Sequence, residues 1–260
     1  AYTVPDTVRV GLESVCKNVA SASIGVWELQ IGMQKGDGFQ RGGVITSGGL
    51  FTARPAVGDY IAVDKTMDCA DALDMANDMK KSGLDTYAAY LSGGDWTVYV
   101  KDASVSAVEA AADENASRVS FEGVAITGGE APVPYRGMLT FSVNGSSMTG
   151  VNIIGLEEYL YGVVPSEMPK SYDAEALKAQ AVAARTYAMT KLGAHTGSGY
   201  QLCDTTACQV YKGYSNEADA TTAAVDATAG EVACYNGSPI EAVFSASTGG
   251  YTESSENVWN

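Results

Sequence analysis

The chain has 260 residues, of which 46% are hydrophobic and 18% charged, and this balance indicates a globular protein with a sizeable core. Its formal net charge of −15 argues against nucleic acid as a partner, because no basic cluster could neutralise a run of phosphates. The same lack argues against an anionic membrane surface. Small molecules, glycans and other proteins remain as partners.

The sequence also bears on export. It contains no run of 18 apolar residues, so it predicts no membrane span. It begins at Ala1 rather than at Met, which is typical of a chain that has lost a secretory signal or a membrane anchor. We therefore expect an exported protein.

The N-terminal part is predicted to form short strands. Residues 7–12 (TVRVGL) are β-rich, and residues 24–31 (IGVWELQI) alternate apolar and polar side chains as a half-buried strand does. Glycine-rich sequences at residues 36–38, 42–43 and 48–49 predict hairpin turns.

The pattern changes near residue 59. It predicts a strand at 60–63, a helix at 68–83, a hairpin at 85–100, a second helix at 103–116 and a strand near 119–126. A small α+β unit with two helices on one face of a sheet is the natural packing for this order.

The C-terminal half alternates strands and helices. Strands are predicted over residues 135–154, with Asn144-Gly145 as the hairpin turn, and a short helix over 157–163. Ser171 or Asp173 can cap a long alanine-rich helix that ends near residue 192. The last predicted elements are a helix at 219–228 and a hairpin whose turn is Asn236-Gly237.

One acid in this half, Glu167, lies between Pro165 and Pro169. Each proline fixes φ near −65° and biases the preceding residue away from helix, so we expect Glu167 on a stiffened loop. Acid/base chemistry needs a carboxylate held in this way. The simpler interpretation is that this proline-flanked glutamate only helps to start the next helix.

Other acids fit structural roles better. Glu157 and Glu158 fall on the short predicted helix, and Glu175 lies in the first turn of the long one, where it complements the macrodipole. Arg185 can form a structural bridge or contact a substrate oxygen.

The chain has five cysteines and one histidine. His195, Cys203 and Cys208 supply one nitrogen and two sulfurs, which are ligand types that zinc prefers. No fourth ligand is identifiable from the sequence. A disulfide between Cys203 and Cys208, which an exported protein permits, is the alternative, and two free thiols are a third.

Several motifs follow one another in order: EYL, VPSEMP, EALKAQA, AARTY, CDTT, CQVY and FSASTGG, at residues 158–160, 164–169, 175–181, 183–187, 203–206, 208–211 and 244–250. Together they resemble the SpoIID/LytB domain of bacterial cell-wall proteins. Residues 56–119 resemble a SPOR-like repeat, a fold that binds bare glycan strands. The resemblance implies a SpoIID-like catalytic domain at 1–55 and 120–260, with a SPOR-like α+β unit inserted at 56–119.

The resemblance also implies an activity. SpoIID proteins are lytic transglycosylases that cleave the β-1,4 bond between N-acetylmuramic acid and N-acetylglucosamine and leave a 1,6-anhydro end. The family's catalytic acid falls on Glu167. Enough of that acid must stay protonated near neutral pH, and apolar surroundings from Val163, Val164 and Met168 would favour this. LytB-type relatives imply an alternative, a non-catalytic glycan-binding protein that enhances a cell-wall amidase.

The predicted site therefore contains Glu167 as the catalytic residue. Polar and aromatic side chains in the matching motifs are the predicted glycan contacts: Ser166, Arg185, Gln209, Tyr211 and Ser247. The chemistry requires no cofactor, and a zinc ion at His195, Cys203 and Cys208 would be structural. Family sequences often carry a histidine directly before the second cysteine, where this chain has Ala207. The expected partners are peptidoglycan glycan strands and a cell-wall amidase, and the expected location is outside the cell or on its wall.

Overall fold

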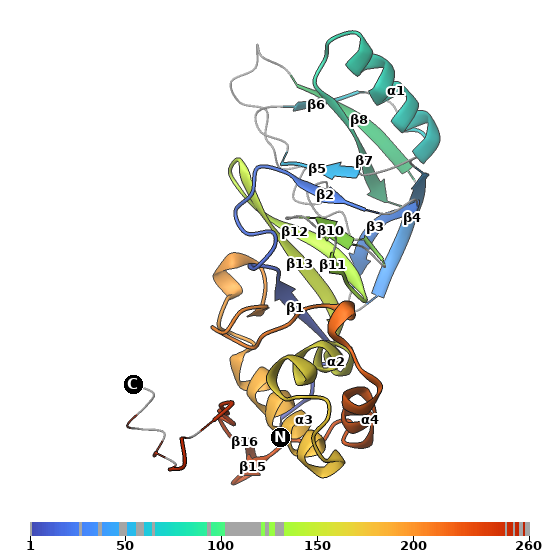
Figure 1. The fold of residues 1–260 in the computed structure, drawn as a ribbon. Coiled ribbons are helices and arrows are strands. Elements are labelled where there is room, and N and C mark those ends of the chain that lie inside the picture. The colour runs from blue at the N-terminus through green and yellow to red at the C-terminus, as the bar shows by residue number, and fades with distance from the viewer. Residues whose placement is uncertain are drawn as a thin grey trace. The chain divides into compact units, whose positions relative to one another are not determined.

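The computed structural model describes residues 2–25, 28–35, 38–46, 51–55, 60–63, 66–92, 95–101, 121–122, 125–127, 133–247, 249–251, 253–254 and 257. Within these ranges the chain forms both helices and strands (Figure 1), which confirms the predicted α+β class. No helix among them combines the length and hydropathy that a membrane crossing requires. The chain divides into two compact units, which are described separately.

One unit comprises Arg9–Ile154 and Gly197–Tyr200. Four strands are neighbours in one of its sheets, in the order β1 (Thr7–Gly11), β13 (Ser147–Gly155), β12 (Met138–Asn144) and β9 (Phe121–Glu122). The predicted β12–β13 hairpin is present, but its turn lies one residue later than predicted. Asn144 pairs with Ser147, and Gly145 (φ +57°) is the first central residue, a position that favours glycine.

A second sheet in this unit has the order β11 (Val133–Pro134), β10 (Ala125–Thr127), β2 (Ala22–Ile24) and β5 (Phe51–Ala53). The single strand predicted over 24–31 was wrong, because β2 ends at Ile24 and β3 (Glu28–Lys35) pairs in a separate sheet. Gly25 follows β2 directly, and glycine weakens a strand interior.

The strand β3 forms a hairpin with β4 (Gly38–Thr46). The predicted turn at Gly42–Gly43 was wrong, since β4 continues through both residues. Ile31 pairs with Gly43 and Gly32 with Arg41, so Gly42 is the extra residue of a β-bulge, a common place for glycine within a strand. The glycines at 48–49 lie outside the described residues.

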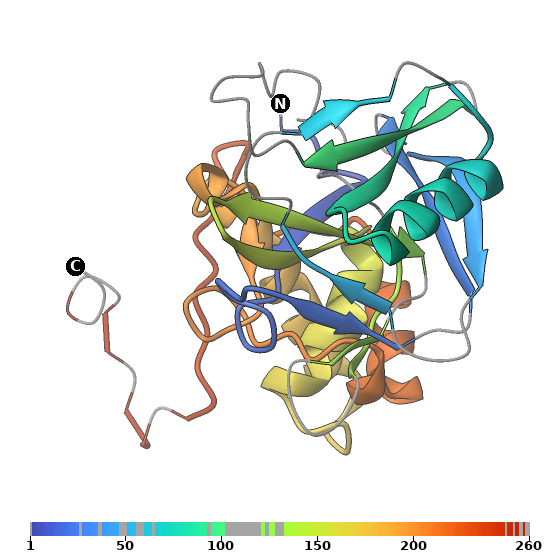
Figure 2. The same cartoon turned by 90° about the horizontal axis from the view of Figure 1, so that it is seen from above.

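A three-stranded antiparallel sheet in the order β6 (Tyr60–Ala62), β8 (Asp95–Lys101) and β7 (Thr86–Ser92) packs against α1 (Cys69–Lys81) (Figures 1 and 2). Asp68 caps this helix by accepting a hydrogen bond from Asp71 N. A small core of apolar side chains lies between helix and sheet: Met67, Ala72, Ala76, Trp96 and Val98.

These elements confirm the predicted order of strand, helix, strand and strand. The second predicted helix, at 103–116, lies outside the described residues. So do residues 56–59 and 102–120, where the predicted boundaries of the inserted unit fall, and the domain boundaries therefore stay predictions.

The other unit comprises Ala1–Val8, Gly155–Thr196 and Gln201–Asn260. Its helices α2 (Leu156–Glu167), α3 (Ala174–Lys191) and α4 (Asp219–Ala227) pack on one another (Figure 1). Its short elements are β14 (Leu202–Cys203), η3 (Tyr214–Asn216), β15 (Cys234–Tyr235) and β16 (Ser238–Pro239), and a 3₁₀ turn, η2 (Thr196–Ser198), starts at its edge.

The long helix α3 agrees closely with its prediction. Of the two predicted caps the structure uses Asp173, whose side chain accepts a hydrogen bond from Glu175 N. Four of its small and apolar side chains are fully or almost fully buried: Leu177, Ala181, Ala184 and Ala188. Small residues let α2 and α4 approach α3 closely.

Candidate active site

The helix α2 carries Glu167 as its last residue, so the prediction that Glu167 lies on a loop after Pro165 was wrong. The helix runs through Pro165, and Met168 N closes its last turn on Val164 O. An internal proline costs about 3 kcal/mol in an exposed helix. Here the fully buried Val163 and Val164 offset that cost, and Ser166 Oγ donates to Gly162 O.

The carboxylate of Glu167 is half-buried and is held from one side. Val210 N–H donates to its Oε1 at 3.0 Å, and this is the one hydrogen bond that the described residues give to this carboxylate. Ser166 beside it accepts from Asn216 Nδ2 at 2.8 Å, which joins the end of α2 to η3. The acid is therefore oriented but keeps one oxygen for other partners.

Val210 belongs to segment 208–211, of which every residue is tied to a helix or turn of this unit. Gln209 accepts from the Tyr159 hydroxyl and donates to Ala184 O. The Tyr211 ring lies 5.1 Å from that of Tyr159, centroid to centroid. A Cβ on Gly162 would lie 2.6 Å from the Tyr211 ring, so this glycine permits the close approach.

Arg185 performs the structural role and has no surface left for a glycan. Its guanidinium is fully buried, donates to both Glu157 oxygens and also reaches Val225 O and Glu231 O. Gly230 N donates to Glu157 as well. The predicted contact between Arg185 and substrate therefore does not fit the structure, because every direction its donors point is filled by protein.

The other predicted glycan contacts differ in how far their side chains are buried. Gln209 and Tyr211 are 1% and 3% exposed, so in this structure they hold segment 208–211 rather than face a ligand. Ser166 is half-buried beside Glu167 and stays a candidate contact. Ser247 is exposed and accepts from Gly249 N, and in the described part of the chain no hydrogen bond joins it to Glu167 or Ser166.

Two tyrosines on α2 keep their protons at physiological pH. Burial raises the pKa of Tyr159 well above its ordinary value, so its hydroxyl remains a donor for Gln209. A hydrogen bond to Asp226, helped by partial burial, raises the pKa of Tyr161 to about 12. That bond joins α2 to α4.

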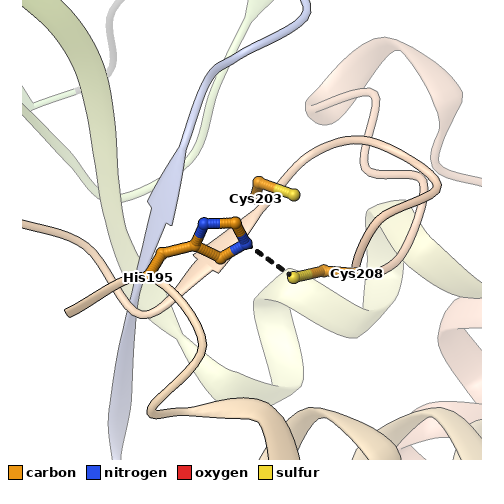
Figure 3. Close-up of side chains that lie close together, drawn as sticks. All are labelled: His195, Cys203 and Cys208. Carbon is orange, nitrogen blue, oxygen red and sulfur yellow. Dashed lines mark hydrogen bonds between the residues drawn. The ribbon is translucent and has the colours of Figure 1, made fainter. Parts of the chain in front are cut away.

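The three side chains His195, Cys203 and Cys208 come together (Figure 3). Their ligand atoms all lie within 4.8 Å of one another, and Cys208 Sγ is 3.3 Å from His195 Nε2. Cys203 ends β14 and is fully buried, whereas His195 lies in the turn after α3. The structure thus assembles the ligand set that the sequence predicted.

This set fits zinc. The 3.3 Å between Cys208 Sγ and His195 Nε2 is close to an edge of a tetrahedral site with bonds of about 2.0–2.3 Å. Among the described residues the group has three members, one fewer than a closed tetrahedral zinc site has. Cys203 and Cys208 are thiols here, and the disulfide stays the alternative prediction for an oxidising compartment.

The sequence did not point to Val210 or to Gln180. Val210 acts through its backbone N–H, which nearly every residue has, so no side-chain signal marks it. Gln180 is 9% exposed, and its Nε2 is, in the described part of the chain, the one buried side-chain nitrogen or oxygen without a hydrogen bond. Its place in the predicted long helix did not indicate a buried amide nitrogen without a hydrogen bond.

Comparisons with known proteins agree with this geometry. Residues 144–235, which hold α2, α3, α4 and the His195 cluster, match the SpoIID family, described as stage II sporulation protein. This part of the chain is therefore similar to the SpoIID domain.

Curated relatives match between about two fifths and one half of the chain. The chain is 54% identical over 101 residues to an amidase enhancer of Bacillus subtilis. The matched region covers 39% of this chain and 13% of that protein. The chain is 38% identical over 148 residues to stage II sporulation protein D of Bacillus amyloliquefaciens (51% and 43%), and 40% over 124 residues to that of Bacillus subtilis (42% and 36%). The matches span less than half the length of each relative.

Proposed function

We propose that this protein is a peptidoglycan lytic transglycosylase that cleaves the β-1,4 bond between N-acetylmuramic acid and N-acetylglucosamine in glycan strands without stem peptides. The observation that carries the proposal is the carboxyl group of Glu167, which ends a buried helix and is oriented by Val210 N–H. Relatives named stage II sporulation protein D support it.

The chemistry needs a single carboxyl group. Glu167 in its acid form donates a proton to the glycosidic oxygen while the bond from that oxygen to C1 of the muramic residue breaks. The muramic 6-hydroxyl then bonds to C1 and returns its proton to Glu167, which closes the 1,6-anhydro ring. No water is consumed, which distinguishes the reaction from the two-carboxylate hydrolases.

The surroundings of Glu167 suit this double role. Among the described residues, one hydrogen bond fixes the direction of the carboxylate and no cation pairs with it. Val163 and Val164, on the preceding turn of α2, are buried. Since the substrate is cell-wall glycan, the proposal includes export of the protein.

We assign the cluster of His195, Cys203 and Cys208 a structural zinc ion, which would supply no step of the reaction. Cys208 directly precedes Gln209, so a metal there would fix the start of segment 208–211. The alternative disulfide would fix the same point of the chain.

The test uses peptide-free glycan strands and mass spectrometry of the products. Wild-type protein is expected to release fragments with 1,6-anhydro-muramic ends, and Glu167→Gln is expected to release them about 10² to 10⁴ times more slowly. Products with ordinary reducing ends, which are heavier by one water, would show hydrolysis instead. Equal activity of wild type and Glu167→Gln removes the assignment.

The second candidate function is enhancement of a cell-wall amidase, which the 54% identity to an amidase enhancer favours. In that case Glu167→Gln should stimulate an amidase on intact peptidoglycan as strongly as wild type does. Loss of stimulation in Glu167→Gln would instead tie any enhancement to glycan cleavage.

A further inference from the structure

Gln209 is buried where α2, α3 and the segment that orients Glu167 meet. It is 1% exposed, and both ends of its amide are bonded within the protein. Its Oε1 accepts from the Tyr159 hydroxyl on α2 at 3.3 Å, and its Nε2 donates to Ala184 O on α3 at 3.1 Å. The side chain therefore links α2 to α3.

The residue after it makes the contact with the acid. Val210 N–H lies on the peptide bond that joins Gln209 to Val210, and it donates to Glu167 Oε1 at 3.0 Å. Fixing the side chain of Gln209 anchors the Cα from which this rigid peptide plane begins, and so restricts where Val210 N–H can lie. Tyr159, which bonds the Gln209 side chain, and Glu167 both lie on α2, so one helix holds the partner of Gln209 and the acid.

The chemistry of the position selects an amide. A glutamine offers an acceptor and donors at one end, whereas a glutamate would place a charge in a fully buried position and could not donate to Ala184 O when ionised. The Tyr159 hydroxyl stays protonated, because burial raises the pKa of Tyr159 well above its ordinary value. The donor that Gln209 needs is thus present at all physiological pH values.

We infer that Gln209 is a positioning residue for the reaction of Glu167: its amide holds the 209–210 peptide so that Val210 N–H orients the acid. This role differs from the glycan contact that the sequence suggested for Gln209, and it rests on the proposed function for the identity of the reaction. Because the side chain is enclosed by protein, Gln209 acts through Val210 and Glu167 and not on the glycan.

The first test replaces Gln209 with methionine, which has a similar length and no hydrogen-bonding amide. A misplaced acid affects turnover more than binding, so kcat for 1,6-anhydro product should fall about 10- to 100-fold while KM changes little. In the Glu167→Gln background, Gln209→Met should have no further effect on the rate, because the residue it positions is gone. A rise in KM alone, or equal losses in both backgrounds, would overturn the inference.

Gln180→Met is the matched control. Gln180 is also a buried glutamine of this unit, but its Nε2 has no hydrogen bond, so its replacement removes no bond of that nitrogen. We expect wild-type kcat and unchanged or slightly raised thermal stability. If Gln209→Met fails to fold, Tyr159→Phe takes its place. This variant removes one of the two Gln209 bonds and keeps the ring, and its loss of kcat should be smaller.

A readout without catalysis separates this inference from the proposed function. Hydrogen exchange of the Val210 amide should be faster in Gln209→Met than in wild type and unchanged in Gln180→Met. If wild type makes no product but Val210 loses protection in Gln209→Met, the proposed function fails and the positioning role stands. If wild type is active and Val210 protection is the same in all three proteins, the positioning role fails and the function stands.

Discussion

The two ends of α2 each carry a glutamate, and the protein treats them in opposite ways. Glu157, in the first turn, receives a buried guanidinium and a backbone N–H, and the helix macrodipole stabilises negative charge there. Among the described residues, Glu167, at the last position, receives one backbone N–H and no cation. The difference is that Glu157 is committed to an ion pair that supports the fold, whereas Glu167 is oriented and open to the substrate that we propose.

The largest expected effect is on the rate at the C-terminal end. Glu167→Gln should lower formation of 1,6-anhydro product by a factor of about 10² to 10⁴, the usual contribution of a positioned acid/base, and leave the unfolding free energy within about 1 kcal/mol. Product analysis by mass spectrometry and urea unfolding check the two parts. Glu175→Gln is the control, because that side chain is 79% exposed and pairs only with Lys178. If Glu175→Gln were equally inactive, the contrast would be lost.

At the other end the same substitution should cost stability instead. Glu157→Gln leaves a fully buried Arg185 without its anion and should lower the unfolding free energy by about 3–5 kcal/mol. Arg185→Met should cost less, since Glu157 is 30% exposed and water can hydrate it. Urea midpoints with unchanged slopes measure both. A larger loss for Arg185→Met would show that the guanidinium's bonds to Val225 O and Glu231 O dominate.

The cluster of His195, Cys203 and Cys208 offers a smaller, indirect effect on the acid. Cys208→Ser should remove about one bound zinc per chain and lower both thermal stability and turnover. Metal analysis of the purified protein, with Cys234→Ser as the control at an exposed thiol, checks this. Protein that carries no zinc and has Cys203 joined to Cys208 would favour the disulfide.

The smallest expected effect lies between the ends of α2, at Tyr161. Its pKa is raised to about 12 by Asp226, so the bond stabilises the fold in full below pH 10 and is lost as pH rises through about 12. Because the pair is largely exposed, Tyr161→Phe should cost only about 0.5–1 kcal/mol at pH 7. The difference between the two proteins in thermal unfolding should shrink above pH 10, and a constant difference would contradict the assignment.

Locally encoded features were predictable from the sequence. The Asp173 cap, the helix near 219–228 and the Asn236-Gly237 turn each depend on a few neighbouring residues, and the structure has all three. In that turn both residues have positive φ, as an Asn-Gly hairpin requires. The ligand set His195, Cys203 and Cys208 was also recognisable, because its chemistry is carried by side-chain type.

Features decided by distant parts of the chain were not predictable. Pro165 favours the end of a helix locally, but burial of its apolar neighbours Val163 and Val164 carries α2 onward to Glu167. Gly42 suggests a turn locally and is a bulge because β3 pairs on both sides of it. Val210 contributes only a backbone N–H. Arg185 fitted two roles until the structure placed it against Glu157.

The position of Glu167 depends on the absence of a Cβ atom at Gly162. Alanine would favour the helix at this position by about 1 kcal/mol, yet its methyl carbon would lie 2.6 Å from the Tyr211 ring and 3.2 Å from Gly213 O. Any displaced Tyr211 would carry its chain neighbour Val210 with it. If Glu167 acts as proposed, a substitution at Gly162 that improves α2 as a helix would therefore slow the reaction, and stability gains have to be sought away from this position.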